Sequence, residues 1–188
     1  LILGYEKWKD YTYLQEASVI LNSIWNKETK RIGSYLVLMP GVKQALEDKI
    51  EINPSYFSPY AFRFFQKYDD IHDWDCLIDS SYYYLNQVMA KTKTNLPPDW
   101  FLIENGQIVL ENSTRSDFSY DAVRVFARIY LDYVNSGEKR ALPVLEKSQF
   151  FVDKWKNSQK FYTNYQANGE LRDKNEYLGS IAILVPVI

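Results

Sequence analysis

The side chains best suited to chemistry are acids and aromatic residues in a few short polar stretches. Asp121 lies in Ser119-Tyr120-Asp121-Ala122-Val123-Arg124, where an amphipathic helix is expected to begin. Arg124 and Arg128 follow at i+3 and i+7, so the three charges share one helix face. An exposed salt-bridge ladder explains such a stripe and contributes roughly a few tenths of a kcal/mol per pair. Alternatively, Arg124 holds Asp121 ionised as a general base for water; spacing alone favours the ladder.

Two proline-bracketed turns carry further candidates. Asn53-Pro54-Ser55-Tyr56 precedes Ser58-Pro59, which is typical of a helix start with proline in the first turn. That structural explanation accounts for Ser58-Pro59 better than for Asn53 and Tyr56. Pro97-Pro98-Asp99-Trp100 is either a rigid turn with a core tryptophan or a loop that presents an acid and an aromatic platform to a groove.

The composition excludes several classes of function. The net charge of -2 argues against a nucleic-acid surface, and no apolar run reaches the length of a membrane span. Cys76 is the only cysteine, and no Cys/His cluster has metal-ligand spacing. The single histidine, His72, lies in a charged run that we expect to be a solvated connector, which argues against a Ser-His-Asp site. We therefore expect no metal and no cofactor.

Aromatic residues make up 16% of the chain, including 16 tyrosines. This content fits a tyrosine-rich core, and it also fits a groove in which sugar rings stack on aromatic faces. Composition alone favours the core.

The elements that must position these residues are helices of about a dozen residues, joined by short and long connectors. An Asn105-Gly106 turn predicts a β-hairpin between Trp100–Ile103 and Ile108–Leu110. Residues 26–40 are expected to form an irregular loop with a short strand at 35–39. Periodicity, caps and breakers predict helices from Asp10 to about Trp25, from Ser58-Pro59, from about Asp73 to Met89, from Tyr120 to Val134 with Val123, Phe126, Ala127, Tyr130 and Val134 on its apolar face, from Leu142 to Trp155, and from near Asn175 onward.

The ordered set of motifs resembles glycoside hydrolase family 8, which includes endoglucanases, chitosanases, lichenases and xylan-active enzymes. The resemblance covers nearly the whole chain, and each tetrapeptide alone is weak. The motifs that carry it are Gly4-Tyr5-Glu6-Lys7-Trp8, Leu38-Met39-Pro40-Gly41, Asn53-Pro54-Ser55-Tyr56, Pro98-Asp99-Trp100 and Ser119-Tyr120-Asp121-Ala122-Val123-Arg124.

The resemblance implies an all-α (α/α)6 barrel and inverting hydrolysis inside a β-1,4-linked polysaccharide such as glucan, xylan or chitosan. It places Asp121 at the position of the general base and Tyr56 where it holds the water or the sugar, with Arg124 orienting Asp121. The other expected cleft residues are Tyr120, Trp100 and Asp99, which line or brace it, and Asn53, which shapes the turn.

The resemblance also implies that parts of the barrel are missing. Such a barrel needs roughly 300 residues, so we expect residues 1–188 to be a single domain that lacks the N-terminal helices and the last helix. The family's acidic glutamate and its Asp-x-Asp pair would lie upstream of Leu1, and nothing places Glu104, Glu170 or Glu176 opposite Asp121. Both ends of the chain are apolar, unlike natural termini.

Two other functions stay open. One is a non-catalytic carbohydrate-binding toroid, and the other is a toroid enzyme of another sugar class, such as an α-glucan hydrolase or a polysaccharide lyase. For the leading function we expect a polysaccharide or oligosaccharide partner, a monomer, and a location outside the cell or in its envelope, since such polymers lie there.

Overall fold

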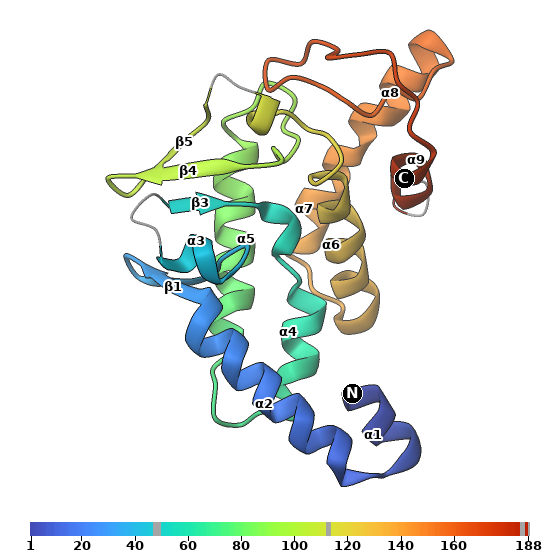
Figure 1. Cartoon of the computed structure of the whole chain (residues 1–188). Coiled ribbons are helices and arrows are strands. Elements are labelled where there is room, and N and C mark those ends of the chain that lie inside the picture. Colours follow the sequence, from blue (N-terminus) through green and yellow to red (C-terminus); the bar gives the residue numbers. More distant parts are fainter. Residues whose placement is uncertain (47–49, 112–113, 185–186, 188) are drawn as a thin grey trace.

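The computed structural model describes residues 1–46, 50–111, 114–184 and 187, and most of this part is helical (Figure 1). The helices are α1 (Ile2–Trp8), α2 (Tyr11–Glu28), α3 (Val42–Leu46), α4 (Pro59–Gln66), α5 (Asp75–Met89), α6 (Val123–Ser136), α7 (Ala141–Leu145), α8 (Gln149–Ser158) and α9 (Leu178–Leu184). The 3-10 turns are η1 (Pro54–Tyr56), η2 (Thr114–Ser116) and η3 (Glu146–Ser148). The strands are β1 (Thr29–Ile32), β2 (Tyr35–Leu38), β3 (Ile50–Ile52), β4 (Phe101–Glu104) and β5 (Gln107–Val109).

Helix α5 lies in the main hydrophobic core, with α4 and the β1–β2 hairpin packed against it. Its side chains are buried over most of its length, among them Leu77, Ile78, Ser81, Leu85, Val88 and Met89. Trp74, just before α5, is fully buried, and its ring packs against Phe62 and Phe65 of α4 with centroids 6.1 Å and 5.1 Å apart. Helix α6 in turn packs along α4. The three helices therefore form the body on which the loops of the site are mounted (Figure 1).

Two small antiparallel sheets complete the described part. Residues 26–40 were expected to be mostly irregular, but β1 pairs with β2 from Thr29↔Leu38 to Ile32↔Tyr35, so only the predicted strand is confirmed. Gly33, with φ of 59°, makes the turn that a side chain would strain. The predicted Asn105-Gly106 hairpin forms as β4–β5, and β3 adds a third strand that no sequence pattern had indicated.

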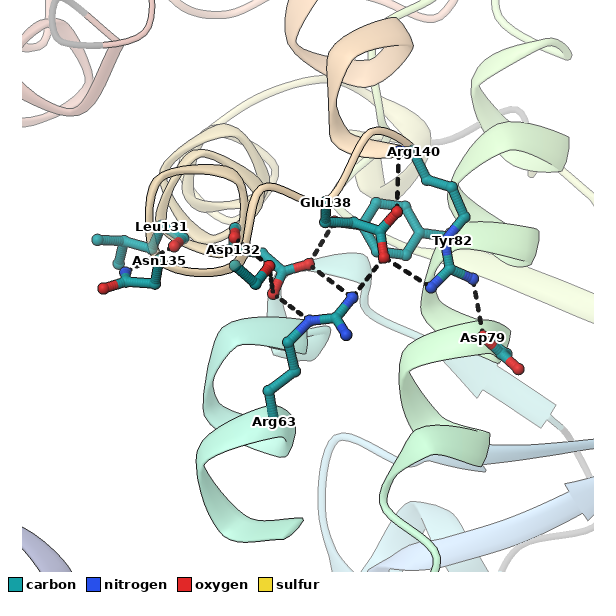
Figure 2. Close-up of polar contacts among 9 residues, drawn as sticks. Arg63, Asp79, Tyr82, Leu131, Asp132, Asn135, Glu138 and Arg140 are labelled. Atoms are coloured by element: carbon teal, nitrogen blue, oxygen red, sulfur yellow. Dashed lines mark hydrogen bonds and ion pairs between the residues drawn. The ribbon is translucent and has the colours of Figure 1, made fainter. Parts of the chain in front are cut away.

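A buried polar network joins α4, α5 and α6 below the site (Figure 2). Asp132 of α6 is fully buried and accepts hydrogen bonds from Arg63 Nε at 2.8 Å and from the Tyr82 hydroxyl at 2.7 Å. Arg63 also donates to Glu138 Oε2 at 2.5 Å. A buried charge must be paired and hydrogen-bonded, so Asp132 fixes how the three helices sit against one another.

Arg140 extends this network after the end of α6. It donates to Glu138 Oε2 at 2.9 Å and to Asp79 Oδ1 at 2.7 Å, and its guanidinium lies over the Tyr82 ring at 4.8 Å. The hydrogen bonds from Arg140 hold the pKa of Glu138 down, to about 2, against the opposing effect of burial.

Several helices differ from the sequence predictions in where they end or in which side chains they bury. The first long helix is capped by Asp10 as predicted, with Thr12 N donating to Oδ1 at 3.0 Å, and extends to Glu28. The predicted fifth helix is interrupted, because η3 separates α7 from α8. On α6 the predicted apolar face is partly wrong: Val134 is exposed, while the charged Asp132 is buried by its partners.

A second core cluster holds the loop after α8 against the start of α6. Phe118 and Tyr165 exchange backbone hydrogen bonds of 2.8 and 3.0 Å. Their side chains pack with Phe126 and Phe151 in one buried cluster. The segment from 161 to 173 is thereby placed beside the turn that carries Asp121.

Candidate active site

Asp121 lies in a turn just before α6, because the helix begins at Val123 and not at the predicted Tyr120. The N–H of Val123 donates to Ser119 O at 3.2 Å, while Arg124 N donates to Asp121 O at 3.1 Å. The side chain of Asp121 is therefore placed at the start of α6 and does not lie along the surface of the helix itself. Asp121 is half-buried, with 31% of its side chain exposed.

The Asp99 carboxylate fixes the backbone of this turn. Its Oδ1 accepts from the N–H groups of Ser119, Asp121 and Ala122 at 3.2, 3.1 and 2.7 Å, and its Oδ2 accepts from the Ser119 hydroxyl. Burial raises the pKa of Asp99, and these hydrogen bonds oppose the rise. The loop from Pro97 to Trp100 thus supplies an internal cap for the turn that carries Asp121.

The carboxylate of Asp121 is held from two sides. Asn53 Nδ2 donates to Oδ2 at 2.7 Å, and Arg124 Nη2 donates to Oδ1 at 2.6 Å. Both oxygens are oriented, yet about a third of the side chain stays open to solvent. A fixed, partly open carboxylate can accept a proton from a water molecule that hydrogen-bonds to it.

The Asn53–Tyr56 turn is docked onto the same arginine. Asn53 is buried, and its Oδ1 accepts from Ser55 N at 2.9 Å, which closes η1. Arg124 Nη2 also donates to Ser55 Oγ at 2.9 Å. Tyr56, the last residue of η1, is 39% exposed. The Asn53–Tyr56 motif therefore does more than start a helix, because the side chains of Asn53 and Ser55 connect η1 to Asp121 and Arg124.

Arg128 departs from the predicted salt-bridge ladder. Arg124 pairs with Asp121, but Arg128 has no ion-pair partner among the residues that the structure describes. Burial lowers the pKa of Arg128, and the neighbouring Arg124 cation lowers it further, while Tyr60 and Tyr56 act in the opposite direction. The stripe therefore carries an excess positive charge near Tyr56.

Aromatic side chains stand beside the turn. Tyr120 is 49% exposed, and its ring meets Tyr177 edge-on with centroids 5.0 Å apart. One face of Trp100 is covered by Arg115, whose guanidinium carbon lies 4.5 Å from the ring centre. Trp100 and Tyr120 line a common cavity of about 310 Å³ with Asp99, Asp117, Ser119, Asn164, Arg172 and Arg115.

Sequence reasoning missed Asp117, Asn164 and Arg172, which belong to this cavity. Arg172 donates to Asp117 at 2.7 and 3.1 Å, and Asp117 is buried. The pair joins segments 55 positions apart, so no local pattern could reveal it. The only signal in the sequence was the position of Asp117, two residues before the Ser119–Arg124 motif.

The charged run that contains His72 is a connector before α5, as predicted, and Asp70, Ile71 and Asp73 are exposed, but His72 itself is buried, so its predicted exposure was wrong. The His72 ring is buried, with Nδ1 2.7 Å from Asp69 Oδ2 and the ring 4.9 Å from that of Trp25. Asp69 also accepts from Trp74 Nε1 at 3.0 Å. Burial tends to raise the pKa of Asp69, and its hydrogen bonds outweigh this and lower it. Among the described residues no serine hydroxyl hydrogen-bonds to the pair, and the His72 ring packs against Trp25 and Trp74.

Three further observations concern the other glutamates, metal ions and membrane-spanning helices. Glu176 accepts from Phe161 N at 2.9 Å and from Lys160, whereas Glu104 and Glu170 are exposed. Within the described ranges, no three His, Cys, Asp or Glu side chains gather closely enough to hold a metal ion. In those same ranges every helix is too short or too polar to cross a membrane.

The chain matches a known protein family and is similar to known enzymes. The family described as Glycosyl hydrolases family 8 matches residues 1–170. The chain is 31% identical over 130 residues to Endoglucanase A of Acetivibrio thermocellus, covering 69% of this chain and 26% of that protein. It is 31% identical over 144 residues to Endoglucanase 2 of Ruminiclostridium josui, covering 75% of this chain and 30% of the relative.

Solved structures agree on the fold. Endoglucanase Cel10 of Klebsiella pneumoniae superposes with a TM-score of 0.80 at 22% identity, over 97% of this chain and 57% of its own. The β-1,3-1,4-glucanase of Paenibacillus sp. X4 gives a TM-score of 0.81 at 22% identity, over 93% and 49%. The predicted all-α fold of (α/α)6 type is confirmed for this incomplete part of a barrel. The chain spans about half the length of these structures and less than a third of the two curated relatives.

Proposed function

The chain belongs to glycosyl hydrolase family 8, and on this premise we propose that the protein hydrolyses internal bonds of a β-1,4-linked polysaccharide with inversion. The observation that carries the proposal is the Asp121 carboxylate, oriented by Asn53 and Arg124 and still partly open to solvent. Inverting hydrolysis needs such a base to activate a water on the face of the sugar opposite the leaving group.

In the proposed reaction, Asp121 accepts a proton from water while the water oxygen bonds to the anomeric carbon. The glycosidic C–O bond breaks, and the leaving oxygen takes a proton from a carboxylic acid across the cleft, at about 6.5–9.5 Å from the base. We assign this acid, and an Asp-x-Asp pair that grips the sugar, to polypeptide preceding Leu1. Residues 1–188 then act as one domain within a barrel completed by further N-terminal helices and a last helix.

The other site residues take supporting roles in this proposal. Tyr56, which is exposed at the end of η1, holds the water or the sugar at the cleavage point. Arg124 orients Asp121 and ties it to Ser55. Asn53 positions Asp121, and Asp99 braces the turn. Tyr120 and Trp100 supply aromatic surface for sugar rings.

The names of the relatives support the substrate class that we propose. The similar proteins carry the names endoglucanase and β-1,3-1,4-glucanase, and a xylanase of Teredinibacter turnerae shares the fold with a TM-score of 0.68. We propose a polysaccharide or oligosaccharide partner, a monomeric protein, and action outside the cell or in its envelope, where such polymers lie.

The stereochemistry of the first product tests the proposal. Cellohexaose incubated with the intact protein should release α-anomeric reducing ends first, seen by proton magnetic resonance before mutarotation. Release of β-anomers would contradict inversion. Unsaturated sugars that absorb in the ultraviolet would identify a lyase, and binding without cleavage would identify a carbohydrate-binding toroid.

A further inference from the structure

We propose that Glu176, Tyr177 and Gly179 are positioning residues, which together hold the ring of Tyr120 in the orientation that meets a sugar. This inference rests on the proposed function, in which Tyr120 supplies aromatic surface for the substrate. The three residues do not contact the sugar in this proposal. Glu176 and Gly179 fix the place of Tyr177, and Tyr177 acts on the ring of Tyr120.

The ring of Tyr120 is open to solvent and needs a neighbour to fix its orientation. Its side chain is 49% exposed, and its hydroxyl makes no hydrogen bond within the described ranges. The ring of Tyr177 meets it edge-on, with centroids 5.0 Å apart and planes at 84°. An exposed side chain loses rotamer freedom when a ligand orders it, and this loss weakens binding. A ring that already restricts Tyr120 removes part of that loss before the sugar binds.

The backbone of Tyr177 is fixed to α9. Tyr177 lies directly before this helix, and its carbonyl oxygen accepts from Ile181 N at 3.1 Å. Helix α9 packs along α6 (Figure 1), and Leu184 of α9 is fully buried in the second core cluster. Because Tyr120 lies shortly before α6 and Tyr177 directly before α9, the packing of the two helices brings the two tyrosines together.

Gly179 leaves the space in which the ring of Tyr177 lies. A Cβ atom at position 179 would come within 2.9 Å of Cε1, 3.1 Å of Cζ and 3.2 Å of the hydroxyl oxygen of Tyr177. A Cβ atom essentially never approaches another heavy atom as closely as 2.9 Å, so alanine at this position would displace the ring. Tyr177 is 51% exposed, so its ring can swing outward without disturbing the core.

Glu176 connects the residue before Tyr177 to the opposite side of the loop. Its Oε1 accepts from Phe161 N at 2.9 Å, and its Oε2 accepts from Lys160 Nζ at 3.4 Å. The ring of Phe161 stacks on the buried ring of Phe151 with centroids 5.8 Å apart, so this attachment point is itself fixed to the core. The hydrogen bond from Phe161 N lowers the pKa of Glu176, against the opposing effect of burial, which keeps the carboxylate ionised at neutral pH.

The orientation of Tyr120 can be measured without any substrate. With 3-fluorotyrosine incorporated into the intact protein, the fluorine resonance of Tyr120 is identified as the signal that Tyr120→Phe removes. Gly179→Ala and Tyr177→Ala should both shift this resonance, because each takes the edge of the Tyr177 ring away from Tyr120. An unchanged resonance in either variant would overturn the proposal.

Kinetics on cellohexaose separate positioning from chemistry. Tyr177→Ala, Gly179→Ala and Glu176→Gln should each raise KM by about 2- to 10-fold, the effect of one side chain left to be ordered by the ligand. They should leave kcat within about threefold. Tyr177→Phe keeps the ring and should retain the wild-type KM. A fall in kcat at unchanged KM would overturn the positioning role.

Glu170→Gln is the matched control for Glu176→Gln. It removes the same charge from the same loop, and Glu170 is exposed, with no side-chain hydrogen bond in the described part of the chain. The control should change neither KM nor kcat. A KM for Glu176→Gln no higher than that for Glu170→Gln would show that the contact with Phe161 N does not position Tyr177.

Calorimetry shows whether Tyr177 acts through Tyr120. Cellohexaose is titrated into Asp121→Asn and into the same protein with Tyr120→Ala, Tyr177→Ala or both. The double change should weaken binding no more than Tyr120→Ala alone, because the two residues act as a unit. Additive losses would mean that Tyr177 contacts the sugar itself and would overturn the positioning role. Since this measurement needs no turnover, a wild-type protein that binds cellohexaose without hydrolysing it would contradict only the proposed reaction.

Discussion

Asn53 and Asp121 are 68 positions apart in the chain, and Asn53 Nδ2 donates a hydrogen bond of 2.7 Å to Asp121 Oδ2. The same asparagine uses its Oδ1 to close η1 through Ser55 N. One buried amide thus couples the turn that carries Tyr56 to the proposed base. The relationship makes Asn53 a positioning residue for Asp121.

Asn53→Ala should lower kcat for cellohexaose by about 10- to 100-fold, because the carboxylate loses one of its two orienting donors. KM should change less. Asn53→Asp should also move the acidic limb of the kcat/KM profile to higher pH, because a second carboxylate disfavours ionisation of the first. Asn26→Ala on exposed α2 is the control. A pH profile identical to wild type for Asn53→Asp would show that the contact does not affect the base.

Asp99 is predicted to act as an acceptor for the turn and not as a proton donor. Asp99→Ala leaves the N–H groups of Ser119, Asp121 and Ala122 without their acceptor and should lower the free energy of unfolding by about 1–3 kcal/mol. Asp99→Asn retains the carbonyl oxygen and should lose less than half as much. Urea unfolding measures both variants, and equal losses would contradict the capping role.

Asp132→Ala should destabilise the protein by about 3–5 kcal/mol, because it removes the buried partner of Arg63, leaving only Glu138 to balance it, and removes the acceptor of Tyr82. Val134→Ala, two positions later on the same helix and exposed, should change stability by about 0.5 kcal/mol or less. Denaturant unfolding of the two variants gives the comparison. Similar losses would mean that the network does not hold α4, α5 and α6 together.

Stability should fall in acid partly through Glu138. Its pKa is about 2 in the folded protein against an ordinary value of 4.5, so the folded state favours the ionised form. The contribution is fully present above pH 4.5 and is lost as pH falls toward 2. After allowance for solvent screening it amounts to about 1–2 kcal/mol. The difference in free energy of unfolding between wild type and Glu138→Gln should shrink between pH 6 and pH 3; a constant difference would contradict this origin.

Local patterns predicted the elements that local forces determine. The Asp10 cap and the Asn105-Gly106 hairpin were both confirmed, because each depends on residues within a few positions of one another. The buried Asp132, the exposed Val134 and the buried His72 were not predicted. Each depends on partners from another helix or loop, and the hydrophobic pattern of a single helix contains no information about them.

Some residues of the candidate site could also be predicted from the sequence, and others could not. Asp121 and Arg124 could be paired from helical spacing, and the resemblance to a family drew attention to Asn53, which donates to Asp121 in the structure. No local pattern connects Asn164 or Arg172 with the turn. Their placement depends on the backbone pairing of Phe118 with Tyr165, which forms only when the chain folds.

The central claim is that Asp121 is the base, and turnover by Asp121→Asn in the intact protein tests it most directly. The substitution keeps the shape of the side chain, so the midpoint of thermal unfolding should stay within about 2 °C of wild type. The value of kcat for cellohexaose should fall by about 100- to 10,000-fold, with binding of the sugar largely retained. A folded Asp121→Asn protein that turns over cellohexaose at the wild-type rate would contradict the account.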